Sequence, residues 1–165
     1  MRVPHLVEKD GAWIADDCTV WGDVTLGREA SLWYGVVVRA DVAKISIGPR
    51  TNVQDLTCIH PQHDQDVRVG ADCVIGHAAL VHGSEVGDSC LIGMGAILMP
   101  GSRIGAGSIV AAGALVPIGM VVPPGSLAVG SPAKVVRAVR PAETAEIAAG
   151  VARYLELARR HCRTV

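Results

Sequence analysis

Phenylalanine is absent from the 165 residues of this chain, and aromatic residues of all kinds make up only 3% of it. Half of the residues are nevertheless hydrophobic, so the core has to be built from Val, Ile, Leu and Ala. Side chains this small and uniform favour a narrow, repetitive interior. The length fits one domain with a short appendage.

The sequence also lacks an excess of charge of either sign. Its formal net charge of −1 gives no electrostatic reason to expect nucleic acid or an anionic membrane as a partner. The charged first ten residues have no apolar run behind them, and no later run reaches a membrane-spanning length without a glycine or a charged residue. We therefore expect a soluble, cytoplasmic protein that binds neither nucleic acid nor membrane.

Paired cysteine motifs are missing as well. The five cysteines include no CxxC, and their number is odd, so the sequence does not predict a disulfide framework. Cys18, Cys73 and Cys90 fall in a recurring slot that is otherwise mostly Ala, Ser or Thr. We expect these three thiols to be small fillers of the core.

A six-residue repeat of aliphatic residues dominates the sequence. Neither the period of a helix nor that of a simple strand explains this spacing. The position four residues after each aliphatic residue is mostly small. The repeating positions are Ile14, Val20, Leu26, Leu32, Val38, Ile47, Val53, Ile59, Val69, Ile75, Val81, Val86, Ile92, Leu98, Ile104, Val110, Val116 and Val122.

This pattern resembles the hexapeptide repeat of left-handed parallel β-helix proteins, most clearly in LIGMGAILMPGSRIGAGSIVAAGALV (91–116). The resemblance implies an all-β triangular prism in which three hexapeptides make one coil. The repeat then gives about six coils, roughly 29 Å tall at the usual spacing between strands. We expect this β-helix domain to cover residues 1–140.

A C-terminal α-helix is predicted within residues 141–165. The repeat stops after VGSPAK (129–134), and Pro141 is a favourable first residue for a helix. An apolar stripe follows, and we expect it to pack along the prism or against a neighbouring subunit. The stripe consists of Ile147, Val151, Leu155, Ala158 and Cys162.

Counting hexapeptides around three faces puts several polar residues into register. The count treats two insertions as loops, one within VRADVAKIS (38–46) and one within IHPQHDQDVR (59–68). Arg39, His60 and His82 then each follow a leading aliphatic residue on the same face. They form one column with a step of about 4.8 Å, the spacing between strands.

The same count places His77 over Asp55 on a different face, with Gln54 beside them. Two imidazoles on adjacent coils can share a zinc ion. His77 points from another face. It is five residues from His82, which is up to about 17 Å along an extended strand. The register therefore predicts a metal held by His60 and His82 of one chain and His77 of the next, which requires a cyclic oligomer. A three-faced prism suggests a trimer.

Five short motifs resemble those of the γ-class carbonic anhydrases, in the family's order and near its spacing. They are VVVRAD (36–41), NVQD (52–55), IH (59–60), IGH (75–77) and VHG (81–83). The resemblance implies a homotrimer with Zn²⁺, or Fe²⁺ as the alternative, at each subunit interface. It also implies the reversible hydration of CO₂ to bicarbonate, with His60, His77 and His82 as the metal ligands.

The family resemblance assigns roles to four further residues. Arg39 and Asp41 match an ion pair that joins subunits, which makes a structural role for them plausible beside a catalytic one. Gln54 and Asp55 match residues that orient metal-bound water or line the site. Asp55 could instead cap a turn.

The chain departs from the best-studied branch of that family in two places. Val42 stands where an acidic residue follows the Arg-x-Asp motif, and the loop PQHDQD (61–66) is short. His63, Asp64 and Asp66 are the residues of this loop that could move protons instead. The remaining histidines, His5, His63 and His161, are not expected to be ligands.

Three other functions fit the same repeat. The main alternative is an acyl-CoA-dependent hexapeptide acyltransferase, because VGSPAK also ends many of those proteins. Such an enzyme needs a histidine base and a cleft for CoA. A metal-dependent thioesterase or other hydrolase, and a metal-bearing structural subunit, are the two remaining hypotheses.

Overall fold

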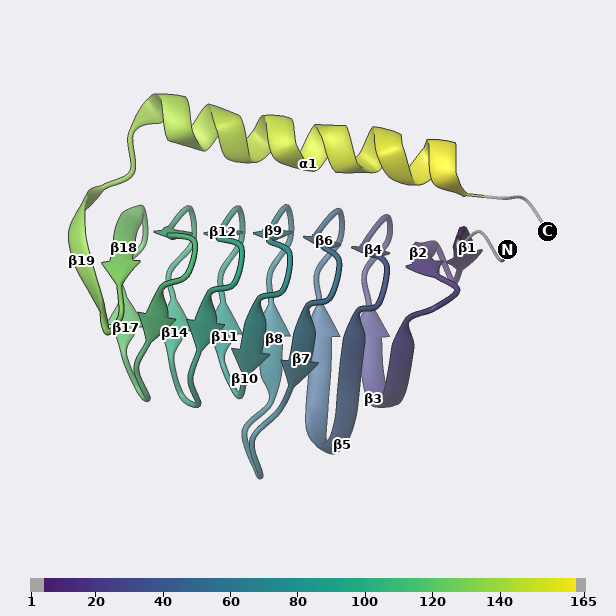
Figure 1. Cartoon of the computed structure of the whole chain (residues 1–165), viewed down its shortest axis with the longest axis horizontal. Coiled ribbons are helices and arrows are strands. Elements are labelled where there is room, and N and C mark those ends of the chain that lie inside the picture. The colour runs from purple at the N-terminus through teal and green to yellow at the C-terminus, as the bar shows by residue number, and fades with distance from the viewer. Residues whose placement is uncertain (1–4, 163–165) are drawn as a thin grey trace.

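The computed structural model describes residues 5–162, which form a parallel β-helix with one helix along its side (Figure 1). The elements are β1 (Leu6–Lys9), β2 (Ala12–Ala15), β3 (Thr19–Leu26), β4 (Ser31–Leu32), β5 (Val37–Ile47), β6 (Asn52–Val53), β7 (Cys58–His60), β8 (Val67–Val69), β9 (Val74–Ile75), β10 (Leu80–His82), β11 (Glu85–Val86), β12 (Leu91–Ile92), β13 (Ile97–Leu98), β14 (Arg103–Ile104), β15 (Ile109–Val110), β16 (Leu115–Val116), β17 (Val121–Val122), β18 (Ser126–Gly130), β19 (Ala133–Ala138) and α1 (Pro141–His161).

The strands wind around three faces in about six coils, as the repeat predicts. Face 1 contains β2, β4, β6, β9, β12, β15 and β18. Face 2 contains β7, β10, β13 and β16, and face 3 contains β8, β11, β14 and β17. The long strands β3 and β5 bend around the corner between faces 2 and 3 and contribute to both. Antiparallel pairing of β1 with β2, and of β18 with β19, ends face 1 on either side.

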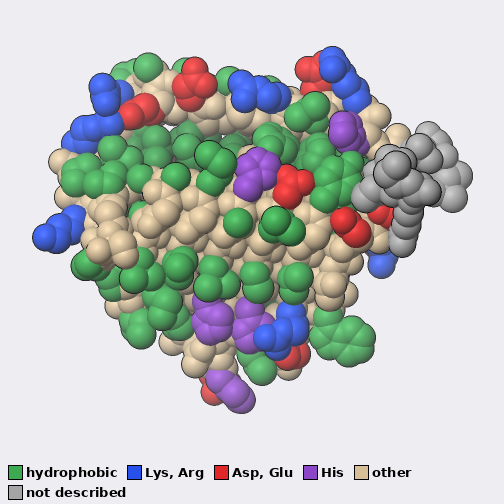
Figure 2. Space-filling view, viewed as in Figure 1, with side chains coloured by type: hydrophobic (Ala, Val, Ile, Leu, Met, Phe, Trp, Pro, Cys, Tyr) green, Lys and Arg blue, Asp and Glu red, His purple; other side chains and the backbone are tan. Residues whose placement is uncertain are grey.

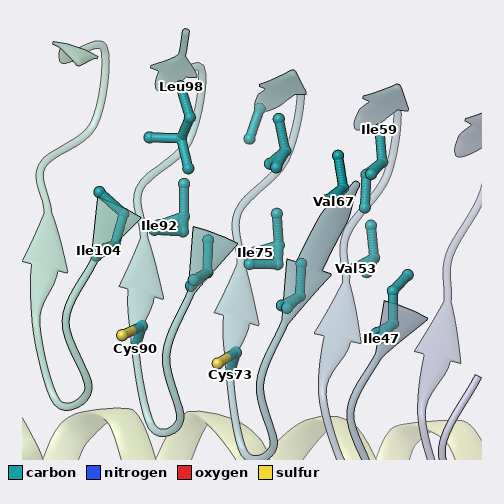
Figure 3. Close-up of a cluster of buried hydrophobic side chains, with 14 of the residues drawn as sticks. Ile47, Val53, Ile59, Val67, Cys73, Ile75, Cys90, Ile92, Leu98 and Ile104 are labelled. Carbon is teal, nitrogen blue, oxygen red and sulfur yellow. The ribbon is translucent and has the colours of Figure 1, made fainter. Parts of the chain in front are cut away.

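The leading residues of the repeat point into the prism and stack coil upon coil (Figure 3). Ile59, Val81 and Leu98 are adjacent in this stack and are completely buried. Burying aliphatic side chains removes apolar surface from water, which is the main force that holds the coils together. Cys73 and Cys90 are buried in the same core, which confirms that they act as small fillers. All five cysteines, which lie within the described residues, are free thiols.

Tight corners explain why glycine recurs in the repeat. At Gly93, an added Cβ would lie 2.4 Å from the backbone nitrogen of Ala112 on the next coil. No side chain fits at that distance, so this corner requires glycine for close approach of the backbone.

The two insertions differ in structure. The first was expected to be a loop, but the structure corrects this: residues 37–47 form the continuous strand β5. β5 pairs with β3 on both faces, and an irregular register between Gly22 and Val24 absorbs the extra length. The second insertion forms a small hairpin between β7 and β8, closed by a bridge between Gln62 and Gln65.

Helix α1 begins at Pro141, as the sequence predicts, and Glu143 fixes its first turn. The Glu143 carboxylate accepts a 2.8 Å hydrogen bond from the Arg140 backbone N–H and binds both terminal nitrogens of Arg137. These contacts, led by Arg137, lower the pKa of Glu143 to about 2. Within residues 5–162 no helix is long and apolar enough to cross a membrane.

The helix packs on face 1 of its own prism, where it contacts β4, β6 and β9 (Figure 1). Ile147 and Val151 pack on Val74 and Ile109, and Ala158 is buried beside Trp33. Of the two locations expected for the helix, the structure therefore adopts the one along the prism of the same chain.

Candidate metal centre

His60 and His82 stand side by side on face 2 because β7 and β10 pair in register. The two residues are direct partners in that ladder, and Val38 of β5 pairs with Ile59 one coil earlier. Arg39 therefore precedes His60 in the same column, as the coil count predicts. The His60 Nδ1 atom lies 3.2 Å from the His82 Nε2 atom, and the ring centroids are 5.2 Å apart.

This pair of nitrogens has the spacing of two ligands on one metal ion. Two nitrogens bound tetrahedrally to zinc at about 2.0–2.1 Å lie about 3.4 Å apart. Metal binding also requires neutral imidazoles. Burial, followed by the nearby charges of His60 and Arg39, lowers the pKa of His82, which favours its neutral form. The donors that this chain presents therefore fit a zinc ion.

Asp41 orients the His60 ring. One carboxylate oxygen accepts a 2.9 Å hydrogen bond from His60 Nε2, and the other pairs with the guanidinium of Arg39. The hydrogen bond from His60 is the main reason why the pKa of Asp41 is lowered. Because Nε2 carries the proton, the lone pair of His60 Nδ1 is directed toward His82. The Arg39–Asp41 ion pair forms within one chain here, and its pairing across subunits stays a prediction.

His77 lies at the corner between faces 1 and 2, two residues after the end of β9. The pairing of Val53 with Ile75 places it one coil above Asp55, as the coil count predicts. Its Nδ1 atom is 2.7 Å from an Asp55 carboxylate oxygen. Asp55 thus fixes the proton on Nδ1 and leaves Nε2 as the unprotonated nitrogen of the ring, an arrangement typical of metal-binding histidines.

Gln54 sits on the face 1 side of this corner and is 6% exposed. Its side-chain nitrogen donates a 3.1 Å hydrogen bond to the Asn52 side-chain oxygen, and Asn52 donates in turn to the Cys73 carbonyl. Trp33 lies one coil below, where it is buried. Trp21, by contrast, precedes Arg39 in the face 2 column and is 66% exposed.

A single chain brings His60 and His82 together but not His77. Among residues 5–162, no group of three or more His, Cys, Asp or Glu side chains could hold a metal ion. Figure 2 shows histidine side chains at separate places on the same side of the molecule. One chain therefore offers two of the three predicted donors at one point and the third at another corner.

Sequence reasoning missed Tyr154, which reaches this corner from helix α1. The Tyr154 hydroxyl is 3.4 Å from His77 Nε2, and its ring packs edge-on against Trp33 at 5.1 Å. The sequence does contain a signal that Tyr154 faces the prism: it lies three residues after Val151 and four before Ala158, on the apolar stripe of the helix. The period indicates that it faces the prism but not which coil it meets.

The other three histidines lie elsewhere on the chain. His5 is beside Asp16, His161 bonds the Tyr34 hydroxyl at 2.9 Å, and His63 is exposed at the hairpin. A charged cavity of about 280 Å³ opens between this hairpin and face 3, and it is lined by Asp64 and Asp66 but by none of the predicted metal ligands.

Comparison with known proteins finds relatives of this chain in sequence and in structure. The family model described as bacterial transferase hexapeptide (six repeats) matches residues 83–117. A carbonic anhydrase of Geobacillus kaustophilus is 48% identical over 126 residues, which cover 76% of this chain and 69% of that protein. Mitochondrial gamma carbonic anhydrase 2 of Arabidopsis thaliana is 37% identical over 162 residues, or 94% of this chain, and this match spans only 58% of the plant protein.

The fold also matches a solved structure closely. A hexapeptide transferase family protein from Anaplasma phagocytophilum superposes with a TM-score of 0.88 at 37% identity. The match covers 93% of this chain and 90% of that one. The solved relative is thus named for transfer chemistry, whereas the two sequence relatives are named as anhydrases.

Proposed function

Since the chain belongs to the γ-carbonic anhydrase-like family of hexapeptide-repeat proteins, we propose that it is a homotrimeric zinc enzyme for the reversible hydration of CO₂ to bicarbonate. One observation carries the proposal: two histidine nitrogens lie 3.2 Å apart, at zinc-ligand spacing, on a chain that holds its third candidate ligand at another corner. Each site then takes His60 and His82 from one subunit and His77 from its neighbour.

An apolar stripe on face 2 supports assembly through this face. It runs next to the histidine column, and its side chains point out of the prism yet are half-buried. Helix α1 packs on face 1, and β19 contacts face 2 at its last strand, β16. A long apolar strip that the chain's own helix leaves uncovered marks a site of association. The stripe consists of Val37, Cys58, Leu80, Ile97 and Leu115.

In the assembled site, the chain's own residues orient the ligands. Asp41 holds the His60 ring, and Asp55 holds the His77 ring, each through one ring N–H. A bound zinc ion would lower the pKa of a coordinated water, to about 7 in carbonic anhydrases. The Gln54 amide, which Asn52 fixes in place, can hydrogen-bond the incoming substrate or product.

Hydration of CO₂ releases a proton that has to reach solvent. His63 is suited to accept it, because imidazole side chains commonly take up and release protons in proton-transfer steps. Its side chain is 77% exposed at the hairpin that directly follows His60. The short loop would thus use a histidine to pass the proton to solvent, where the best-studied branch of the family uses an acidic loop.

An acyl-CoA-dependent acyltransferase is the second candidate, because the solved relative is named as a transferase. Such an enzyme needs a histidine base and a site for CoA, but not two histidines at ligand spacing. Isothermal titration with CoA separates the two functions. Tight binding of CoA to metal-free protein would favour the transferase.

Stopped-flow CO₂ hydration on zinc-quantified protein tests the proposal. We expect activity that follows zinc content and disappears in His82→Ala while the trimer persists. Zinc-loaded wild type without activity would reject CO₂ hydration.

A further inference from the structure

His77 presents a single nitrogen to a metal, and this nitrogen is already engaged within the chain. Asp55 occupies the Nδ1 side of the ring at 2.7 Å, so only the Nε2 lone pair remains for coordination. The Tyr154 hydroxyl, 3.4 Å away, donates toward that lone pair. A metal bond of about 2.0 Å and a hydrogen bond on one lone pair exclude each other.

Tyr154 is held in this position by its surroundings. Its ring packs edge-on against Trp33, which is 4% exposed and donates a 3.0 Å hydrogen bond from its indole N–H to Ser31. The buried Ala158 anchors the next turn of the helix in the same cluster. The phenol therefore reaches His77 as part of a docked helix and not as a loose surface side chain.

The Asp55 carboxylate fixes the tautomer of His77 by accepting from Nδ1. Nε2 is then the acceptor of the ring, and a tyrosine hydroxyl is a donor suited to it.

From this geometry we infer that Tyr154 competes with the metal for Nε2 of His77. Helix α1, which carries Tyr154, thereby controls the binding of zinc to this third ligand. The inference rests on the proposed function, because it takes His77 as a zinc ligand. Zinc has to displace the tyrosine hydroxyl before the site between subunits is complete. Removing the hydroxyl should therefore strengthen and speed zinc binding.

Zinc titration of chelator-stripped protein against a chromogenic chelator tests this inference. We expect Tyr154→Phe to bind zinc about three- to tenfold tighter than wild type and to load faster, the range for loss of one competing neutral hydrogen bond. Tyr34→Phe is the matched control. Tyr34 also packs on Trp33 and also bonds a histidine, but its partner is His161. We expect its zinc affinity to stay within about twofold of wild type.

A second variant keeps the test decisive if phenylalanine disturbs the packing. Tyr154→Leu also removes the hydroxyl, and unfolding midpoints of the metal-free proteins report whether the helix stays docked. Unchanged or weaker zinc binding in both Tyr154 variants, beside lost binding in His82→Ala, would overturn the competition between Tyr154 and zinc and leave the proposed function standing. Wild type that binds no zinc would overturn both.

Discussion

The Nδ1 atom of His60 lies 3.2 Å from the Nε2 atom of His82 on the next coil. This relationship follows from the repeat, because two residues in equivalent positions of adjacent coils are direct partners in a parallel ladder. The spacing between coils brings two imidazoles to the separation of two ligands on one metal ion, and the third candidate donor, His77, stands at another corner.

Replacing Asp55 should weaken zinc binding without removing a ligand. In Asp55→Asn the carboxylate that fixes the proton on Nδ1 of His77 is lost, so the ring loses its preferred tautomer and orientation. We expect zinc affinity to fall by about 10- to 100-fold, the usual cost of losing a partner that orients a ligand. Equilibrium competition with a chelator measures the change. Wild-type affinity in this variant would show that Asp55 only supports the turn.

A charge on the face 2 stripe should break the assembly. Ile97→Asp places an ionised carboxylate in the apolar strip, and burying it in an interface without a partner is costly. Light scattering should report a mass near the 17.1 kDa of one chain in place of three times that value, together with loss of zinc. Val121→Asp is the control, because Val121 is 60% exposed on face 3. Dissociation of this control as well would place the interface elsewhere.

Acid should remove the contribution of Glu143 to stability. Folding lowers its pKa from 4.5 to about 2, chiefly through Arg137. The ionised carboxylate therefore stabilises the fold fully above pH 4.5, and the contribution is lost as the pH falls from 4.5 to about 2. Glu143→Gln should unfold more easily than wild type at pH 7, and the two should converge toward pH 2. Denaturant unfolding across this range would contradict the account if the difference were independent of pH.

Substitution by alanine should lower the stability of the fold by different amounts at two corner glycines, Gly93 and Gly95. Gly93→Ala drives a Cβ to 2.4 Å from the Ala112 backbone nitrogen, so one coil has to shift. Gly95 has φ +65° but nothing within 4 Å of an added Cβ, so Gly95→Ala carries only the left-handed backbone cost of about 1–2 kcal/mol. Denaturant unfolding should show the larger loss in Gly93→Ala. Equal losses would mean that the corners are not limited by contact between coils.

The sequence predicts the columns well because each coil repeats the same local pattern. Register between coils follows from the spacing of buried residues, so the stacking of His77 on Asp55 and of His82 on His60 can be counted from the sequence alone. Interactions outside the repeat could not be counted. The first insertion extends a strand because β3 pairs with it over a second face, and Tyr154 reaches His77 through the docking of a helix whose axial position no period determines.

Subunit mixing tests the central claim, that each metal site is shared between two chains. His77→Ala and His82→Ala are each expected to bind no zinc and to show no CO₂ hydration. When the two are unfolded together and refolded at equal ratio, about one site in four should combine an intact His60–His82 pair with an intact His77 of the neighbouring subunit. We predict that zinc content and CO₂ hydration return to about a quarter of the wild-type level. Trimers that recover neither would contradict a site shared between chains.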